Sequence, residues 1–544
     1  MLLGHWIAGE MMVDPNLQPV LSGVAQLRDM TTVEEKTMSA SLEHPARDRS
    51  RYVTSGSLLA RNTVWNLVGQ IAPMVAGLLV IPKLIHGLGT DRFGALSIAW
   101  MVVGYFSLFD LGLGRALTSL VAFKLGKEEH DDLPDVVWTA NALMLLLGIC
   151  GLLAFFAAAP ALVHRFLKIP VHLQPEILTS FRILSLSIPF VISTAGFRGV
   201  LEAKQQFRTI NAVRIPLGTL MFLGPLAVLQ FSRSLVPSVA VLTIIRALFC
   251  GVYLLVIVRF MPELRPRVRF RTGLVGKLLT FGGWMTVTNL IGPVMINMDR
   301  FLVGALVSLA AVSYYATPYE IVTKLSIVPF ALATVLFPAF SFSSTMDDQG
   351  NLAHLFDRSL THVMLLLFLP SLLMVALANT GMRLWLGEAF ASRSSFVLQL
   401  LSIGVFANGI AQVPFALVQG MGRPDLTAKL HLAELLLYVP AVWWLSSSYG
   451  IRGTALAWVL RAVVDAVLLF AAVVHVLPVS ASIVRDACFR ITVAIAFLVV
   501  GMYTTGPVRA AFALLTFVLF VLTSWFFVLS QNERAFLMRI TKFV

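Results

Sequence analysis

The sequence predicts an all-α polytopic membrane protein of about fourteen transmembrane helices, on three observations. First, the chain has 544 residues, 58% of them hydrophobic and 13% charged, with a mean hydropathy of +0.84. A soluble protein is about a quarter charged, so lipid must be the solvent for most of this chain. Second, apolar runs of about 20 residues, the length that crosses a bilayer as a helix, follow one another along the sequence. Third, the basic residues lie in short loops between these runs, so the net charge of +13 indicates membrane topology and no nucleic-acid partner.

The segment that precedes the first run, residues 1–56, is polar and of mixed charge and is predicted to be a disordered cytoplasmic tail. Two sets of six spans follow, and two more spans come after the second set. We place the spans at 62–86, 92–117, 136–160, 178–202, 209–231 and 236–260, then 281–306, 312–342, 359–379, 396–419, 426–448 and 453–476, and finally 488–505 and 508–530. The predicted units are therefore a first lobe at 57–272, a second lobe at 273–477, and two additional spans with the C-terminus at 478–544.

The two sets of spans are interpreted as an internal repeat. A shift of 219 residues lays Trp65 on Trp284, each near the start of its set. In the sixth span of each set, LTIIRALF and AWVLRAVV place Arg246 and Arg461 at similar depth. Six spans per set make both halves run in the same direction, so we expect a parallel repeat about an axis along the membrane normal.

Basic residues in the loops predict the orientation. The loop between spans six and seven is the richest in Arg and, with the other loops on its side, predicts that the N-terminus is cytoplasmic. An even number of spans returns the C-terminus to the same side. This loop either attracts anionic membrane lipids, at about 1 kcal/mol per basic residue, or only sets the topology.

Sequence motifs for enzymatic chemistry are missing. There is no GxxxxGK[ST] phosphate loop, no HExxH and no CxxC, and Cys150, Cys250 and Cys488 fall within apolar runs. No loop between spans exceeds about twenty residues. A membrane glycosyltransferase or ligase usually needs a sizeable extramembrane loop or domain to hold its sugar substrates, so the short loops argue against such an enzyme. We therefore predict that the protein is not an enzyme and uses no cofactor or metal.

Ionisable residues inside the spans are the main functional signal, because each costs about 2.5–3.5 kcal/mol at a helix centre. Asp299 and Arg300 overlie apolar residues of the first span when the repeat is aligned, which predicts them inside span seven. Adjacent helical residues point about 100° apart, so their partners must come from other helices. Glu320 and Lys324, spaced i, i+4, are expected to complete a cluster that either binds substrate or is purely structural.

Three other groups of intramembrane charges have different candidate partners. Arg246 has no acid at helical spacing, so its partner is either a backbone carbonyl or an anion such as phosphate. Arg461 could be satisfied by Asp465 at i, i+4. Arg198 and Arg214 lie near cytoplasmic ends of spans and are expected to snorkel.

Three further charges complete the candidate set. Asp110 and Arg115 lie in FDLGLGRAL, towards the inner end of span two. Glu434 is an isolated acid in span eleven and is the candidate for proton coupling, a role that burial deep in the bilayer would suit. At a shallower depth it would be an ordinary acidic side chain.

The stretch from Asn62 to Leu117 resembles the opening of bacterial polysaccharide-repeat flippases, which belong to the multidrug/oligosaccharidyl-lipid/polysaccharide exporter superfamily. The matching pieces are LGTDRFG and DLGLG in that stretch, NMDRFLVG at Asn297–Gly304, and GMGRPDLTAK before span eleven. The resemblance extends over roughly residues 57–476. The arginine pattern of the lipid II flippase branch is not matched, because only Lys83 and Arg92 stand near the first loop.

The resemblance implies two six-helix lobes around a central cationic cavity in the bacterial inner membrane. It also implies transfer of an undecaprenyl-pyrophosphate-linked oligosaccharide to the periplasmic leaflet by ion-coupled alternating access, with polysaccharide polymerase machinery as a further partner to test. The alternatives are a multidrug or cation antiporter of the same fold, a membrane enzyme of polysaccharide assembly, and a non-transporting scaffold. If Arg246 and Arg461 bind substrate, both should line one cavity. The candidate cavity residues are Asp110, Arg115, Arg246, Asp299, Arg300, Glu320, Lys324 and Arg461.

Overall fold

A computed structural model describes residues 56–106, 110, 112–126, 132–264, 270–276, 298–345, 349–528 and 534. The predicted N-terminal tail and most of the predicted span at 281–306 lie outside these residues. The chain divides into two units, Met1–Val64 and Trp65–Val544, and the description below concerns the second.

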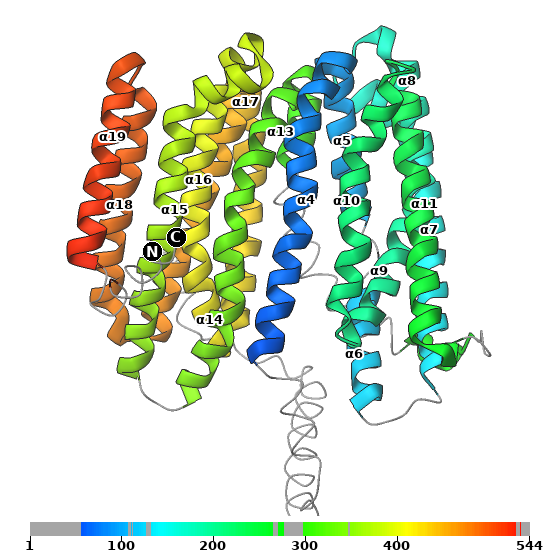
Figure 1. Ribbon diagram of the computed structural model, residues 1–544, viewed down its shortest axis with the longest axis horizontal. Coiled ribbons are helices and arrows are strands. Elements are labelled where there is room, and N and C mark those ends of the chain that lie inside the picture. The colour runs from blue at the N-terminus through cyan, green and yellow to red at the C-terminus, as the bar shows by residue number, and fades with distance from the viewer. Residues whose placement is uncertain are drawn as a thin grey trace, which may run out of the picture. The chain divides into compact units, whose positions relative to one another are not determined.

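The described residues form helices and contain no strand, which confirms the all-α fold class. Ten of the helical segments are long and apolar enough to cross a membrane; the predicted number of fourteen spans is not established. The α-helices, labelled as in Figure 1, are α4 (Gly56–Leu88), α5 (Thr90–Phe106), α6 (Leu113–Gly126), α7 (Leu133–Ala161), α8 (Gln174–Ser185), α9 (Ile188–Ala203), α10 (Phe207–Leu229), α11 (Leu235–Phe260), α13 (Leu309–Val322), α14 (Ile327–Thr345), α15 (Gln349–Leu386), α16 (Glu388–Gly420), α17 (Pro424–Val476), α18 (Ala481–Tyr503) and α19 (Gly506–Thr523).

The predicted second span, 92–117, is wrong at its inner end. Helix α5 ends at Phe106 and α6 begins at Leu113, with Asp110 in the turn that precedes α6. The Asp110 carboxylate accepts hydrogen bonds from the backbone N–H groups of Gly112 (2.9 Å) and Gly114 (3.2 Å), as a helix N-cap does. Gly112 has φ 69°, a backbone conformation that favours glycine, so the apolar run turns there.

Helix α17 is a hairpin of two helices. Its 53 residues would extend about 80 Å as one helix, far more than a bilayer requires. Gly450 interrupts it with φ 59°, ψ −139°, and the hydroxyls of Ser446 and Thr454 lie 2.8 Å apart across the bend. The two arms agree with the predicted spans 426–448 and 453–476.

Two prolines leave backbone oxygens without their helical hydrogen bond, and side chains of other helices donate to these oxygens. Proline has no N–H, so the carbonyl four residues earlier loses its helical partner. Pro82 frees the oxygen of Leu78, which accepts a hydrogen bond from Trp385 Nε1 (2.7 Å). Pro318 likewise frees the oxygen of Tyr314, which accepts one from Ser394 Oγ (2.8 Å).

The helices pack as two groups joined through α5 and α13. Helices α6 to α11 contact mainly one another, as do α14 to α18, and α13 packs on both α5 and α16. Helices α18 and α19 lie at one edge of the bundle, where both contact α15 (Figure 1).

At the α5–α13 seam, Gly94 faces the backbone oxygen of Leu309 so closely that a Cβ at Gly94 would lie 2.0 Å from it. Ser313 Oγ donates to the Thr90 oxygen at 2.6 Å in the same seam. Only glycine permits this approach, so the backbones of α5 and α13 are in direct contact at Gly94.

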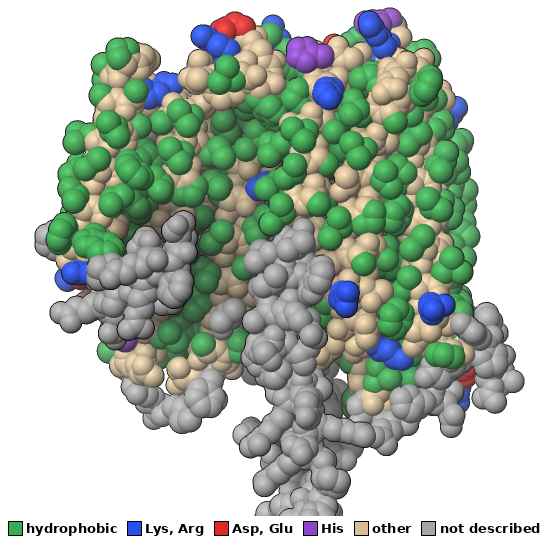
Figure 2. All heavy atoms as spheres, in the orientation of Figure 1, with side chains coloured by type: hydrophobic (Ala, Val, Ile, Leu, Met, Phe, Trp, Pro, Cys, Tyr) green, Lys and Arg blue, Asp and Glu red, His purple; other side chains and the backbone are tan. Residues whose placement is uncertain are grey.

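The surface is apolar across its middle. Figure 2 shows hydrophobic side chains over a broad band of the visible face, while most charged side chains gather towards its upper and lower margins. Leu514 and Leu515 of α19 are 64% and 58% exposed, which is unfavourable in water and ordinary in lipid. These features are those of a multi-pass membrane protein.

Candidate functional site

The first group of helices encloses a cavity of about 650 Å³, which we call the arginine cavity. It lies among α6, α9, α10 and α11, and Asp110 and Gly112 of the turn before α6 also line it. Four arginines and two acids line it, so its charged side chains sum to two positive charges. The charged lining residues are Asp110, Arg115, Arg198, Glu202, Arg214 and Arg246.

Among the cavity arginines, Arg246 has the fewest neighbouring groups that offset its charge. Its Nε is buried and has no hydrogen-bond partner among the described residues. By contrast, Arg198 Nε lies 3.1 Å from Glu202 Oε1, and Asp110 is occupied by the cap of α6. An anion that entered the cavity would therefore meet Arg246 without first breaking an ion pair.

Two cavity residues differ from expectation. Arg198 and Arg214 were expected only to snorkel towards the aqueous boundary, yet both line the arginine cavity. The sequence shows that they stand near helix ends but not which way they face. Asp110 and Arg115, both predicted, lie in the same cavity.

A second group of charges joins the helix at 298–306 to α13 and the short 3₁₀ segment after it, as the sequence analysis expected. Arg300 NH1 lies 3.0 Å from Glu320 Oε1, and Lys324 Nζ lies 3.5 Å from Glu320 Oε2. Asp299, which is fully buried, accepts hydrogen bonds from Tyr315 OH and from the Arg300 backbone N–H. The cross-helix cluster is therefore present and is largely satisfied by its own members, as a structural network would be. A role for it in substrate binding stays a prediction.

The Arg300 guanidinium also lies over an aromatic ring. Its Cζ is 4.2 Å from the centroid of Tyr319, within the range of a cation–π interaction.

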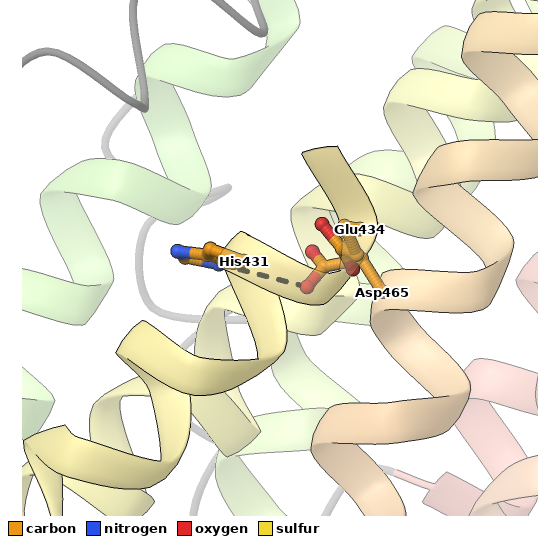
Figure 3. Close-up of side chains that lie close together, drawn as sticks. All are labelled: His431, Glu434 and Asp465. Atoms are coloured by element: carbon orange, nitrogen blue, oxygen red, sulfur yellow. Dashed lines mark ion pairs between the residues drawn. The ribbon is translucent and has the colours of Figure 1, made fainter. Parts of the chain in front are cut away.

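A third group of charges lies inside the α17 hairpin. Arg461 was expected to pair with Asp465, but its NH1 lies 3.8 Å from Glu434 Oε2, on the other arm. Asp465 Oδ1 instead lies 3.7 Å from His431 Nε2. Glu434 is thus not the isolated acid that was expected, because the hairpin brings Arg461 and Asp465 of the other arm beside it. Figure 3 shows Asp465 and His431, which lies one turn before Glu434 on its own arm, next to the Glu434 carboxyl group.

His431 is a site residue that the sequence analysis missed. It stands three residues before Glu434 on one helical face, and this spacing was the available signal. One ligand atom each of His431, Glu434 and Asp465 can be chosen so that all three lie within 4.8 Å of one another, close enough to hold a cation between them.

Arg246 and Arg461 do not share a cavity in the described residues. Arg246 lines the arginine cavity, whereas Arg461 Cζ lies 5.8 Å from the ring centroid of Tyr438 and 5.7 Å from that of Trp458. Neither side chain faces lipid alone. The two repeat-related arginines therefore have different surroundings.

Fold and site together define a multi-pass helical membrane protein with an internal cationic cavity. Residues 59–344 match the family model described as polysaccharide biosynthesis protein, and the chain belongs to this family. A putative O-antigen transporter of Shigella flexneri is 30% identical over 76% of this chain and 96% of the relative. The lipopolysaccharide biosynthesis protein WzxC of Escherichia coli is 23% identical over 74% of this chain and 78% of the relative.

Solved structures show the same fold. The lipid II flippase MurJ, in an inward closed conformation, matches with a TM-score of 0.68 over 86% of this chain and 99% of its own, at 14% identity. A multidrug resistance MATE family transporter in its inward-facing conformation matches with a TM-score of 0.62 over 79% of this chain and 98% of its own, also at 14% identity. At this identity the likeness concerns the fold alone.

Proposed function

We propose that the protein is a flippase that moves a lipid-linked oligosaccharide repeat unit across the inner membrane for surface or exopolysaccharide biosynthesis. Its family and its relative named as an O-antigen transporter support this function. The observation that carries it is the arginine cavity, where four arginines inside an apolar bundle face only two acids and leave an excess of two positive charges. A secondary transporter performs no covalent step, so we assign no enzymatic reaction.

The cavity chemistry fits the diphosphate of an undecaprenyl-pyrophosphate carrier. Guanidinium groups bind phosphate oxygens in bidentate fashion, and each such charge-assisted hydrogen bond contributes about 1.5–3 kcal/mol. The sugars can occupy the polar interior while the polyprenyl chain stays in the lipid. We keep Arg300, Lys324 and Arg461 as further candidate contacts along the path of the substrate. Because Arg461 does not line the arginine cavity, it would contact the substrate at a second position, reached at another stage than the contact with Arg246.

The direction of transport follows from the predicted topology, with both termini cytoplasmic. Helices α6 and α9, which line the cavity, lie towards one end of the bundle (Figure 1). The loop after α6 is cytoplasmic in the predicted topology, so we propose that the arginine cavity opens inward. The α5–α13 seam would then be the closed outer side, and its separation would expose the cavity to the periplasmic leaflet.

The lobes predicted at 57–272 and 273–477 would be the bodies that rock. We keep the coupling ion as part of the proposal, with Glu434 as the candidate acid. Membrane lipids and polysaccharide polymerase machinery are the proposed partners beside the substrate.

Replacement of Arg246 tests the function. In a deletion strain complemented with the variant, Arg246→Gln should lower surface polysaccharide at least tenfold while the membrane level of the protein stays normal. Lipid-linked repeat units should accumulate in the inner leaflet. Arg233→Gln, at an exposed position in the loop before α11, is the matched control and should behave as wild type. Normal surface polysaccharide in the deletion strain itself would overturn the proposal.

A multidrug antiporter is the second candidate, because a MATE transporter shares the fold. The four arginines of the cavity oppose it, since they would repel cationic drugs. Efflux of a cationic dye that depends on this protein, with unchanged polysaccharide, would favour the antiporter.

A further inference from the structure

The α17 hairpin contains two carboxylates whose charge is not compensated by hydrogen bonds. Glu434 is 2% exposed and Asp465 is 4% exposed. Both oxygens of Glu434 and Oδ1 of Asp465 lack a hydrogen-bond partner among the described residues. Figure 3 shows the two carboxyl groups turned towards each other, with His431 beside them. Two buried carboxylates without donors are strongly unfavourable when both are ionised, and a bound cation would stabilise them.

The charges around these carboxylates indicate which cation fits. Glu434 and Asp465 carry two negative charges and Arg461, at 3.8 Å from Glu434, carries one positive charge. One negative charge remains, and a single proton removes it. A divalent metal would leave an excess positive charge beside Arg461. Close carboxylates commonly share one proton, because both cannot ionise at short distance.

Most of the charged and titratable side chains around Glu434 and Asp465 already have other partners. On the hairpin itself they are His431, which lies against Asp465, and Tyr438, whose ring contacts Arg461. From α16, the Phe415 ring stacks on His431 at 5.7 Å. From the helix at 298–306 and from α13 the charged and titratable groups are Asp299, Arg300, Tyr315, Tyr319 and Glu320, which bind one another.

Arg461 is held loosely in this arrangement. Its Nε has no hydrogen-bond partner among the described residues, and its contact with Glu434 is longer than a hydrogen bond. Cation–π contacts with Trp458 and Tyr438 (5.7 Å and 5.8 Å from Cζ to the ring centroids) do not use the N–H donors of the guanidinium, which can bind a second anion.

We propose that Glu434 and Asp465 bind one proton between them and that this proton decides whether Arg461 is held by Glu434 or is released to bind an anionic group of the substrate. This inference rests on the proposed function and assigns its coupling site. It replaces a single coupling acid by a pair. Because linkage is reciprocal, protonation of the pair strengthens anion binding at Arg461, and anion binding strengthens proton binding.

Infrared spectroscopy of the purified protein tests the pair without any transport. A protonated buried carboxyl has a C=O stretching band that shifts in D₂O, and the wild type should gain one such band over a pH titration. Glu434→Gln and Asp465→Asn should each abolish it, because both residues hold the same proton. Glu202→Gln, which removes an acid of the arginine cavity, is the control and should retain it.

Two outcomes would overturn the shared proton. A band that survives both substitutions would show that the proton lies elsewhere. Stoichiometric Zn²⁺ or Mn²⁺ that stays with wild-type protein after chelator treatment, and is lost in Glu434→Gln, would show a metal site in place of the proton.

Binding of undecaprenyl pyrophosphate to the detergent-solubilised protein tests the release of Arg461. The wild-type affinity should rise roughly tenfold from alkaline to acid pH. Glu434→Gln, which mimics the protonated acid, should keep the higher affinity at every pH, and Arg461→Gln should lower it. A wild type that binds this lipid nowhere in the range would count against the proposed function, whereas equal pH dependence in wild type and Glu434→Gln would count against the coupling alone.

Discussion

The indole N–H of Trp385, near the end of α15, donates a hydrogen bond of 2.7 Å to the backbone oxygen of Leu78 in α4. The acceptor is free because Pro82 supplies no N–H four residues later. A kink-prone position in one half of the chain is thereby tied to a side chain from the other half.

Replacement of Trp385 by Phe should therefore destabilise the protein. The ring remains but the Leu78 oxygen loses its donor, at a cost of about 1–3 kcal/mol. Thermal unfolding in detergent measures the change. Trp443→Phe, at a ring that is 55% exposed, should leave the unfolding temperature unchanged, and equal effects of the two substitutions would contradict the prediction.

A methyl group at Gly94 should open the α5–α13 seam. In Gly94→Ala the new Cβ meets a backbone oxygen that cannot rotate away, and overpacking of this kind costs about 1–3 kcal/mol. With the native cysteines removed, disulfide formation between cysteines placed at Thr90 and Ser313 should fall. Gly104→Ala, where a Cβ meets nothing within 4 Å, is the control. An unchanged cross-linking yield in Gly94→Ala would show that the seam tolerates the methyl group.

Removal of Arg300 should cost more stability than removal of Lys324. Arg300→Gln removes the buried cation beside fully buried Asp299 and leaves Glu320 with the exposed Lys324 contact, which costs about 3–5 kcal/mol. Lys324 contacts Glu320 where both side chains are more than 40% exposed, so Lys324→Gln should cost less than about 1 kcal/mol. Unfolding temperatures of the two variants in the same detergent provide the comparison. A larger loss in Lys324→Gln would reverse the assignment.

Asp132, in the turn before α7, should contribute a small stability that depends on pH. A hydrogen bond from Lys124, 3.1 Å away, lowers the pKa of this carboxyl, with a further contribution from the charge of Arg271. A lowered pKa means that the stabilisation is present above the unfolded-state value and is lost as the pH falls through the folded value. The Asp132 side chain is 50% exposed, so Asp132→Asn should cost less than about 1 kcal/mol at neutral pH and nothing in acid. Unfolding curves at the two pH values measure it, and an undiminished effect in acid would contradict it.

The apolar runs predict most of the helices because run length is set by the bilayer. The reversal at Gly450 was predicted since a small polar stretch separates two runs of spanning length. The turn at Asp110 was missed because it lies within a run whose hydrophobicity does not fall. Only the carboxylate cap and the conformation of Gly112 reveal it.

Charge partners were harder to predict than helices. The i, i+4 spacing correctly placed Glu320 beside Lys324, but it favoured Asp465 for Arg461, where Glu434 from the facing arm lies nearer. Spacing describes one helix surface and carries no information on what faces it. For the same reason the cavity positions of Arg198 and Arg214 could not be predicted.

The hairpin at Gly450 has a consequence for how the bundle handles ions. Both carboxylates stand on arms that are joined by one short bend, so their separation does not depend on how far the two halves tilt. A change of conformation can therefore alter which aqueous compartment reaches the pair without separating the two carboxylates. Loading would be governed by access through the half-exposed imidazole of His431, and the direction of ion flow by which side of the membrane that imidazole faces.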